Sequence, residues 1–213
     1  MEINPVLYKT LSENLRHKSN EVIDRYSRRM AVFSESPETL GIGEIYLKSI
    51  LWDFLDDAIS AGVTTLFTSL SYGADSAAAE LFTERKQEGA DVRIVHIPAS
   101  KDWRKDMDPA VQGFAANSFS VGFDYSKQIS GAAAENDRRI RDRFIIDQCL
   151  HITFVLDLSD DTEHSYIWNL FDYAASTHSN AITHNIHLLD CRIPGTPLKT
   201  DETAGQPFQA PLF

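Results

Sequence analysis

The sequence predicts a three-layer α/β fold, in which helices cover both faces of a mainly parallel sheet of about five strands. Short apolar runs rich in β-branched and aromatic residues alternate along the chain with longer segments of helical periodicity. Gly and Pro mark the boundaries between these segments. Because parallel strands are joined by crossover helices and are buried on both faces, this alternation is typical of a Rossmann-like domain.

Five segments are predicted to be strands because each is a short apolar run bounded by polar or turn-forming residues. They are residues 31–33, 63–68, 92–97, 151–156 and 181–189. Four segments are predicted to be helices from apolar residues at i, i+3 and i+4. They are residues 44–61, 74–87, 132–149 and 165–176. A loop is expected over 34–43, and the stretch 100–130 is too mixed to assign.

The chain of 213 residues is expected to form one main domain over residues 29–190. Residues 1–28 are polar with a few apolar positions at helical spacing, which predicts a short N-terminal helical extension. Residues 191–213 are rich in Pro, Gly and Thr and are predicted to be a flexible tail.

The net charge of −11 argues against general nucleic-acid binding, which needs a basic surface to replace the counterions of the phosphates. No apolar stretch approaches the length of a membrane span, so we expect no membrane contact. The N-terminus lacks a basic segment followed by an apolar run, so no signal peptide is expected. Two cysteines make no disulfide framework, and together these features favour the cytoplasm.

No metal or cofactor is expected. His184 and His187 are three positions apart in a predicted strand, which places them on opposite faces, and their spacing to Cys191 fits no standard zinc pattern. The P-loop, the full Gly-x-Gly-x-x-Gly fingerprint and the Gly-x-Ser-x-Gly elbow are all absent from the sequence.

The segment 68–80 is the best candidate for a binding loop, because it places small residues and hydroxyls between a strand and a helix. Small residues let a ligand approach the backbone, and a helix start attracts phosphate or carboxylate. The candidate contacts here are Ser69, Leu70, Ser71, Gly73 and Asp75. The alternative is an ordinary strand-to-helix turn, in which Asp75 is favoured only because the helix dipole stabilises a carboxylate in the first turn.

Four arginines gather on the predicted helix 132–149, at positions 138, 139, 141 and 143. Arg141 or Arg143 is a candidate for a bidentate clamp on a phosphate. The alternative is a solvated helix with local ion pairs to neighbouring aspartates.

Two other loops belong to the same predicted edge of the sheet. Ser34 and Glu35 follow the first strand and are candidate ligand contacts. The loop after the fourth strand is acidic, and its hydroxyls are candidates for capping the next helix.

Taken in their order along the chain, the motifs resemble those of the YpsA-like branch of the SLOG superfamily, named for the Smf/DprA and Lonely Guy proteins. The resemblance covers about residues 29–190. It is carried by Ala31-Val32 before a Pro-containing loop, Leu40-Gly41-Ile42-Gly43, Ser69-Leu70-x-x-Gly73-x-Asp75-x-x-Ala78-Ala79-Glu80, Ile97-Pro98 with Trp103, and Arg141-Asp142-Arg143-Phe144-x-x-Asp147.

The resemblance implies a Rossmann-like fold, a nucleotide-derived ligand and a homo-oligomer. It places Ser69, Leu70, Gly73, Asp75, Arg141 and Arg143 at the ligand site. Two departures weaken anion binding. The branch's Gly-His-Arg-Pro is replaced by Ser34-Glu35-Ser36-Pro37, and its Gly-Gly-Thr by the acidic run at 160–163. The phosphoribohydrolase motif Pro-Gly-Gly-x-Gly-Thr is missing.

The sequence therefore favours a module that binds or senses a nucleotide or nucleotide-derived small molecule. Two alternatives remain open. One is a hydrolase of an N-glycosidic bond that uses Glu35, Asp75 or Glu80 as acid or base. The other is a protein-interaction module with a vestigial pocket. Whether the protein is an enzyme is left open by the sequence.

Overall fold

The computed structural model describes residues 25–71, 73–98, 119–120, 133–157, 165–176 and 184–192. It contains a six-stranded sheet in which every neighbouring pair is parallel. The strands are β1 (Arg29–Ser34), β2 (Thr65–Thr68), β3 (Arg93–His96), β4 (Phe119–Ser120), β5 (His151–Leu156) and β6 (Asn185–Asp190). Most of the helical extension predicted over 1–28 and the tail from 193 onward lie outside the described residues.

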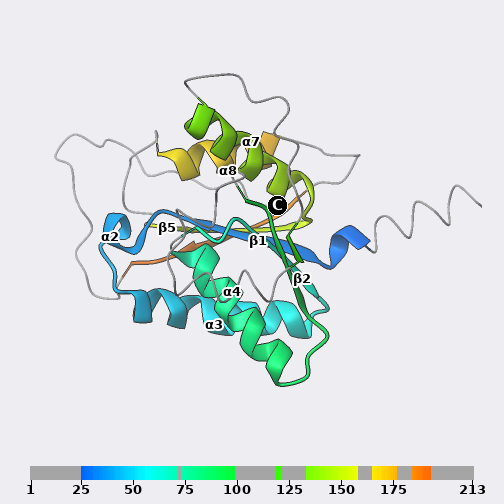
Figure 1. Cartoon of the computed structure of the whole chain (residues 1–213). Helices are drawn as coiled ribbons and strands as arrows, with labels where there is room; N and C mark the ends of the chain where they lie inside the picture. Colours follow the sequence, from blue (N-terminus) through cyan, green and yellow to red (C-terminus); the bar gives the residue numbers. More distant parts are fainter. Residues whose placement is uncertain are drawn as a thin grey trace, which may run out of the picture.

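Helices cover both faces of this sheet, which confirms the three-layer α/β fold (Figure 1). The helices α3 (Glu44–Ser60) and α4 (Ala74–Gln87) pack on one face, and α7 (Ala133–Asp147) and α8 (Tyr166–Ser176) pack on the other. Each face has its own apolar cluster, because apolar side chains alternate between the two sides of each strand. Leu51 and Phe82 belong to the first cluster, and Ile145 and Leu170 belong to the second.

The strand order is β4-β3-β2-β1-β5-β6, so β1 lies inside the sheet. From β1 the chain builds strands outward to β4, and then returns to the other side of β1 to form β5. The β1–β5 pairing is continuous from Met30↔His151 to Ser34↔Val155. In open parallel sheets, ligands bind beyond the carboxyl ends of the strands where this order reverses. Here that point lies between β1 and β5.

Several elements differ from the sequence prediction: β1 covers 29–34 rather than 31–33, and β2 begins at Thr65 rather than at 63. The expected loop over 34–43 contains a short helix, α2 (Pro37–Leu40), so that prediction was wrong there. Its ends follow ordinary capping chemistry: Ser36 accepts a hydrogen bond from the amide of Thr39, and Gly41 ends the helix in the left-handed conformation. The two-residue strand β4 was not predicted. The last strand ends at Asp190 rather than at 189.

Both cysteines are free and buried; Cys191 is 1% exposed although it begins the segment predicted to be a flexible tail. Burial raises the pKa of Cys149 well above its ordinary value, and burial with nearby carboxylates raises the pKa of Cys191 to about 11. Neither thiol is therefore activated as a nucleophile. In the described part of the chain, no helix combines the length and the apolar character of a membrane span.

Candidate functional site

The loop between β2 and α4 is organised around the carboxylate of Asp75, which lies in the first turn of α4. One oxygen accepts a hydrogen bond from the hydroxyl of Thr68. The other accepts from the hydroxyl of Ser69 and from the amides of Ser69 and Ser71, at 3.0 and 3.1 Å for the amides. Asp75 is only 6% exposed. These four bonds satisfy most of its acceptor capacity, so Asp75 shapes the loop rather than facing an open pocket.

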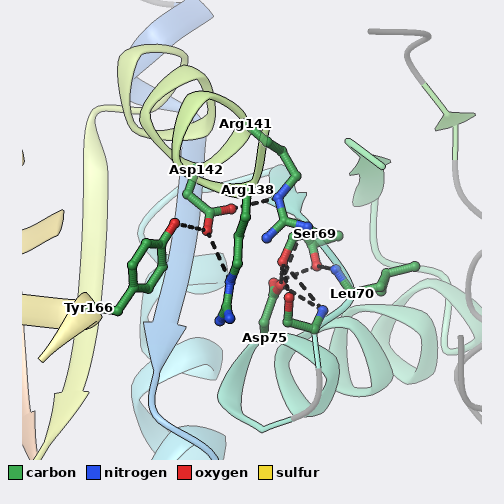
Figure 2. A network of polar contacts seen from close by, with 9 residues as sticks. Ser69, Leu70, Asp75, Arg138, Arg141, Asp142 and Tyr166 are labelled. Carbon is green, nitrogen blue, oxygen red and sulfur yellow. Dashed lines mark hydrogen bonds and ion pairs between the residues drawn. The ribbon is translucent and has the colours of Figure 1, made fainter. Parts of the chain in front are cut away.

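Burial raises the pKa of Asp75, while the hydrogen bonds from Ser69, Thr68 and Ser71 and the positive charge of Arg141 act in the opposite direction. Arg141, which comes from α7 on the other face of the sheet, lies beside this loop at the tip of β2 (Figure 2).

Two unusual backbone conformations shape the same loop. Leu70 has a φ of +54°, although its side chain is buried in the α3–α4 core. Gly73 has a φ of +117°, and a Cβ placed on it would lie 3.0 Å from Ser34 Oγ and 3.2 Å from the carbonyl oxygen of Glu35. Strain of this kind gathers at functional sites. Glycine is required at 73 because the loops after β1 and β2 touch there.

Ser34 and Glu35 link the end of β1 to two helices. Ser34 Oγ accepts a hydrogen bond from the amide of Ala74, the first residue of α4, at 3.0 Å. Glu35 Oε1 accepts one from the amide of Ile167, in the first turn of α8, at 3.5 Å. Ser165 caps the same helix, because its hydroxyl accepts a hydrogen bond from the amide of Trp168 at 3.2 Å. The sequence predicted this role for the hydroxyls of the loop before α8.

Arg141 is the cation of the site, and its guanidinium extends from α7 toward Ser69 (Figure 2). The residue is 6% exposed. Its Nε donates to Asp142 Oδ1 at 2.7 Å. Among the described residues, no acceptor lies within hydrogen-bonding distance of its two terminal amino groups. Four donor hydrogens of the guanidinium fork are thus directed to the edge of the sheet without a partner in the described chain.

Asp142 fixes the position of this arginine. It is 2% exposed and accepts a second hydrogen bond, at Oδ2, from the hydroxyl of Tyr166 on α8 at 2.7 Å. Arg138 lies on the same side of α7, with its guanidinium 4.6 Å from the centre of the Tyr166 ring and its Nε 4.0 Å from Asp142 Oδ2 (Figure 2). One carboxylate thus joins two arginines and one tyrosine.

Arg143 does not join the other candidates. It is exposed, and its guanidinium lies 4.7 Å from the centre of the Tyr173 ring. Two helical positions correspond to a rotation of about 200°, so Arg141 and Arg143 point to opposite sides of α7. The predicted clamp by Arg141 or Arg143 is therefore reduced to Arg141. Arg138 shares its side because it lies three positions away, a spacing visible in the sequence.

His96 was missed by the sequence analysis. It ends β3, beside β2, and it is fully buried. Burial and the nearby charge of Arg141 lower the pKa of His96 to about 4, although a backbone hydrogen bond with Ser69 acts against them. The ring is therefore neutral at physiological pH. The only signal in the sequence was a polar residue at the end of a predicted apolar strand, two residues before Pro98.

Two further candidates lie away from this edge. Glu80 forms an ion pair with Lys48 of α3 at 2.6 Å, on the face of the sheet opposite to Arg141. His184 hydrogen-bonds through Nδ1 to the carbonyl of Cys149, whereas His187 packs against Phe54 of α3, so the two histidines face opposite sides. The described residues contain no group of three metal-binding side chains. The acidic run at 160–163 lies outside the described residues.

No protein-family model matches the chain, and no curated protein matches it. The resemblance to the SLOG superfamily stays a prediction that rests on the motifs given above.

Proposed function

We propose that the protein binds a small anionic ligand, derived from a nucleotide, at the carboxyl edge of its parallel sheet. The observation that carries the proposal is the guanidinium of Arg141, a buried cation whose terminal donors have no partner among the described residues. Burying a cation is costly unless it is paired and hydrogen-bonded. Asp142 supplies one such contact, and an anionic ligand would supply the rest.

The geometry of the guanidinium supports phosphate or carboxylate as the anion. Asp142 engages only Nε, which leaves the two terminal amino groups as a fork for bidentate binding. In the adjacent loop the hydroxyl of Ser69 donates to Asp75, so the hydroxyl of Ser71, 2.7 Å from it, is the one that could turn to donate to a ligand. The nucleotide character of the ligand is supported by the sequence resemblance alone.

The contacts made by the candidate acid and base residues favour ligand binding without a chemical step. Asp75 is occupied by four hydrogen bonds within the loop, and Glu80 is paired with Lys48. Two of the three acid or base candidates of a glycosidic hydrolase are thus engaged in structural contacts. Of the three, only Glu35 lies at the carboxyl end of β1, and its carboxylate accepts a hydrogen bond from the amide of Ile167.

A ligand panel tests the proposal. Inorganic phosphate, AMP and ADP-ribose are added to the purified protein, and the melting temperature is expected to rise with at least one of them. For that ligand, calorimetry should show affinity at least about tenfold weaker in Arg141→Ala, because a charge-assisted bidentate contact is lost.

Arg143→Ala is the matched control, since it removes the same charge from the exposed side of the same helix. Its affinity is expected to equal that of the wild type. Unchanged affinity in Arg141→Ala, with a circular dichroism spectrum like that of the wild type, would remove the basis of the proposal.

A further inference from the structure

We propose that Glu35 makes this site selective for a ligand with a single anionic group and a hydroxyl-bearing part, and that it excludes a second phosphate from the carboxyl ends of β1 and β5. The inference rests on the proposed function and specifies its ligand class. It assigns to Glu35 a role in specificity that is separate from the anion contact of Arg141.

Glu35 stands at the centre of the edge where ligands of parallel sheets bind. It is the first residue after β1, and β1 and β5 are the strands between which the order reverses. Its carbonyl oxygen lies against Gly73, and its side chain reaches the first turn of α8. The backbone of Glu35 thus lies against the loop after β2, and its carboxylate is held by the first turn of α8.

The N-terminus of α8 is the natural second anion site of this fold, because its first amides are free of intrahelical partners. In this chain two of those amides are bonded to the protein's own oxygens. Ile167 donates to the Glu35 carboxylate, and Trp168 donates to the Ser165 hydroxyl. A phosphate entering here would displace Glu35 and would also meet its negative charge. The carboxylate takes the place of an anionic ligand at this helix.

The positive and negative parts of the site lie over different strands. Arg141 is near Ser69 after β2 and influences His96 at the end of β3 (Figure 2). Glu35 follows β1 and contacts the helix after β5. Neighbouring parallel strands are about 4.8 Å apart, so the two groups are separated by roughly one to two strand spacings. A sugar phosphate spans this separation, with its phosphate at Arg141 and its hydroxyls toward Glu35.

The second carboxylate oxygen of Glu35 is suited to the hydroxyl-bearing part. Within the described residues, only Oε1 has a hydrogen-bond donor, the amide of Ile167. Oε2 therefore keeps its lone pairs for donors from a ligand, and carboxylates accept well from neighbouring hydroxyls of a ribose. The class of ligand is a sugar or nucleoside monophosphate rather than a bisphosphate or a pyrophosphate.

The test compares ribose 5-phosphate with ribose 1,5-bisphosphate by calorimetry in the wild type and in Glu35→Gln. The variant keeps the shape of the side chain and its oxygen for Ile167 but removes the charge. We expect its affinity for the bisphosphate to rise about tenfold, with the monophosphate changing less than about twofold. Glu84→Gln, which removes one charge from the body of α4, should leave both affinities unchanged.

An unchanged ratio of the two affinities in Glu35→Gln would overturn the inference and leave the proposed function intact.

If the wild type binds neither sugar phosphate, the proposed function fails for this class of ligand, and a titration with inorganic phosphate then tests the role of Glu35 alone. A phosphate-dependent shift of the Ile167 amide signal in the variant, absent in the wild type, would support the inference. No shift would overturn it. Glu35→Ser replaces Glu35→Gln in both measurements if the latter does not fold.

Discussion

Asp75 and Gly73 act mainly on the shape of the loop between β2 and α4. The carboxylate of Asp75 collects donors from Thr68, Ser69 and Ser71, which fixes the path of the chain between β2 and α4. Gly73 permits the contact with the end of β1. Both residues matter for a ligand through the shape of the loop that would receive it.

Replacing Gly73 by alanine is expected to destabilise the protein by about 1–3 kcal/mol, because the backbone at φ +117° is strained for any residue with a Cβ. The new methyl group would also meet Ser34 Oγ at 3.0 Å. Urea denaturation measures the loss. Gly43→Ala is the control, since Gly43 has a φ of −79° and a Cβ added there would meet nothing within 4 Å. Equal losses in the two variants would contradict this account.

The sequence predicted the course of the chain between β2 and α4 better than it predicted which arginine lies beside it. Small and hydroxyl-bearing residues between a strand and a helix are a local signal, and the loop forms where that signal lies. The choice between Arg141 and Arg143 depends on which side of α7 meets the sheet, which one helix does not encode by itself. His96 was missed because its surroundings, including Arg141, whose charge helps to lower its pKa, are distant in sequence.

At the level of elements, α7 and α8 form one supporting unit for the site. Tyr166 at the start of α8 donates to Asp142 of α7, which holds Arg141. Burial, with the negative charge of Asp142, raises the pKa of Tyr166, so its hydroxyl stays a donor throughout the physiological range. The position of α8 is thereby linked to the position of the arginine.

Tyr166→Phe removes this link without changing the ring. Because the bond is made to a carboxylate that is 2% exposed, we expect a loss of about 1.5–3 kcal/mol in the free energy of unfolding. The affinity for the anionic ligand should fall as well, since Asp142 is then less restrained. Tyr46→Phe is the comparison: its hydroxyl donates to the exposed carbonyl of Arg192, and a neutral bond there contributes only about 0.5–1 kcal/mol. A smaller effect at 166 than at 46 would refute the link.

Helix periodicity was sufficient to predict α3, α4, α7 and α8 within a few residues. It did not predict α2, because a four-residue helix has too few positions to show a period. Capping chemistry was the better guide there: Ser36, Pro37 and Gly41 match the start and end of a short helix.

For the molecule as a whole, the buried His96 predicts a dependence of stability on pH. Its pKa is about 4 in the folded chain, against an ordinary value of 6.5. Between these values the unfolded chain binds a proton that the folded chain does not, so stability falls as the pH falls through this window. The pKa of His187 is also lowered, by burial and by His151, and acts in the same direction.

Unfolding free energies of the wild type and His96→Gln, measured between pH 7 and pH 4, check this prediction. The wild type is expected to lose on the order of 3 kcal/mol more than the variant over this range. Asp75, whose pKa is raised by burial, contributes with the opposite sign in both proteins, so the difference between them isolates His96. Parallel curves would mean that His96 accepts a proton in the folded state.

The alternation of strands and helices is a local property, and it was sufficient to predict the parallel three-layer fold. The order of the strands was not predicted, because it depends on pairings such as Met30 with His151 that no local pattern encodes. The strand β4, with two residues, is too short to give an alternating pattern.

The two faces of the sheet are covered by helices at different times during synthesis, because the strand order returns to β1 only after β4. The first three strands and α3 and α4 leave the ribosome well before α7 and α8, which cover the other face of the sheet. At roughly 5–20 residues per second, apolar side chains such as Phe33 and Phe67 remain uncovered for several seconds. The nascent half-sheet therefore exposes one apolar face until translation has delivered the second half of the domain.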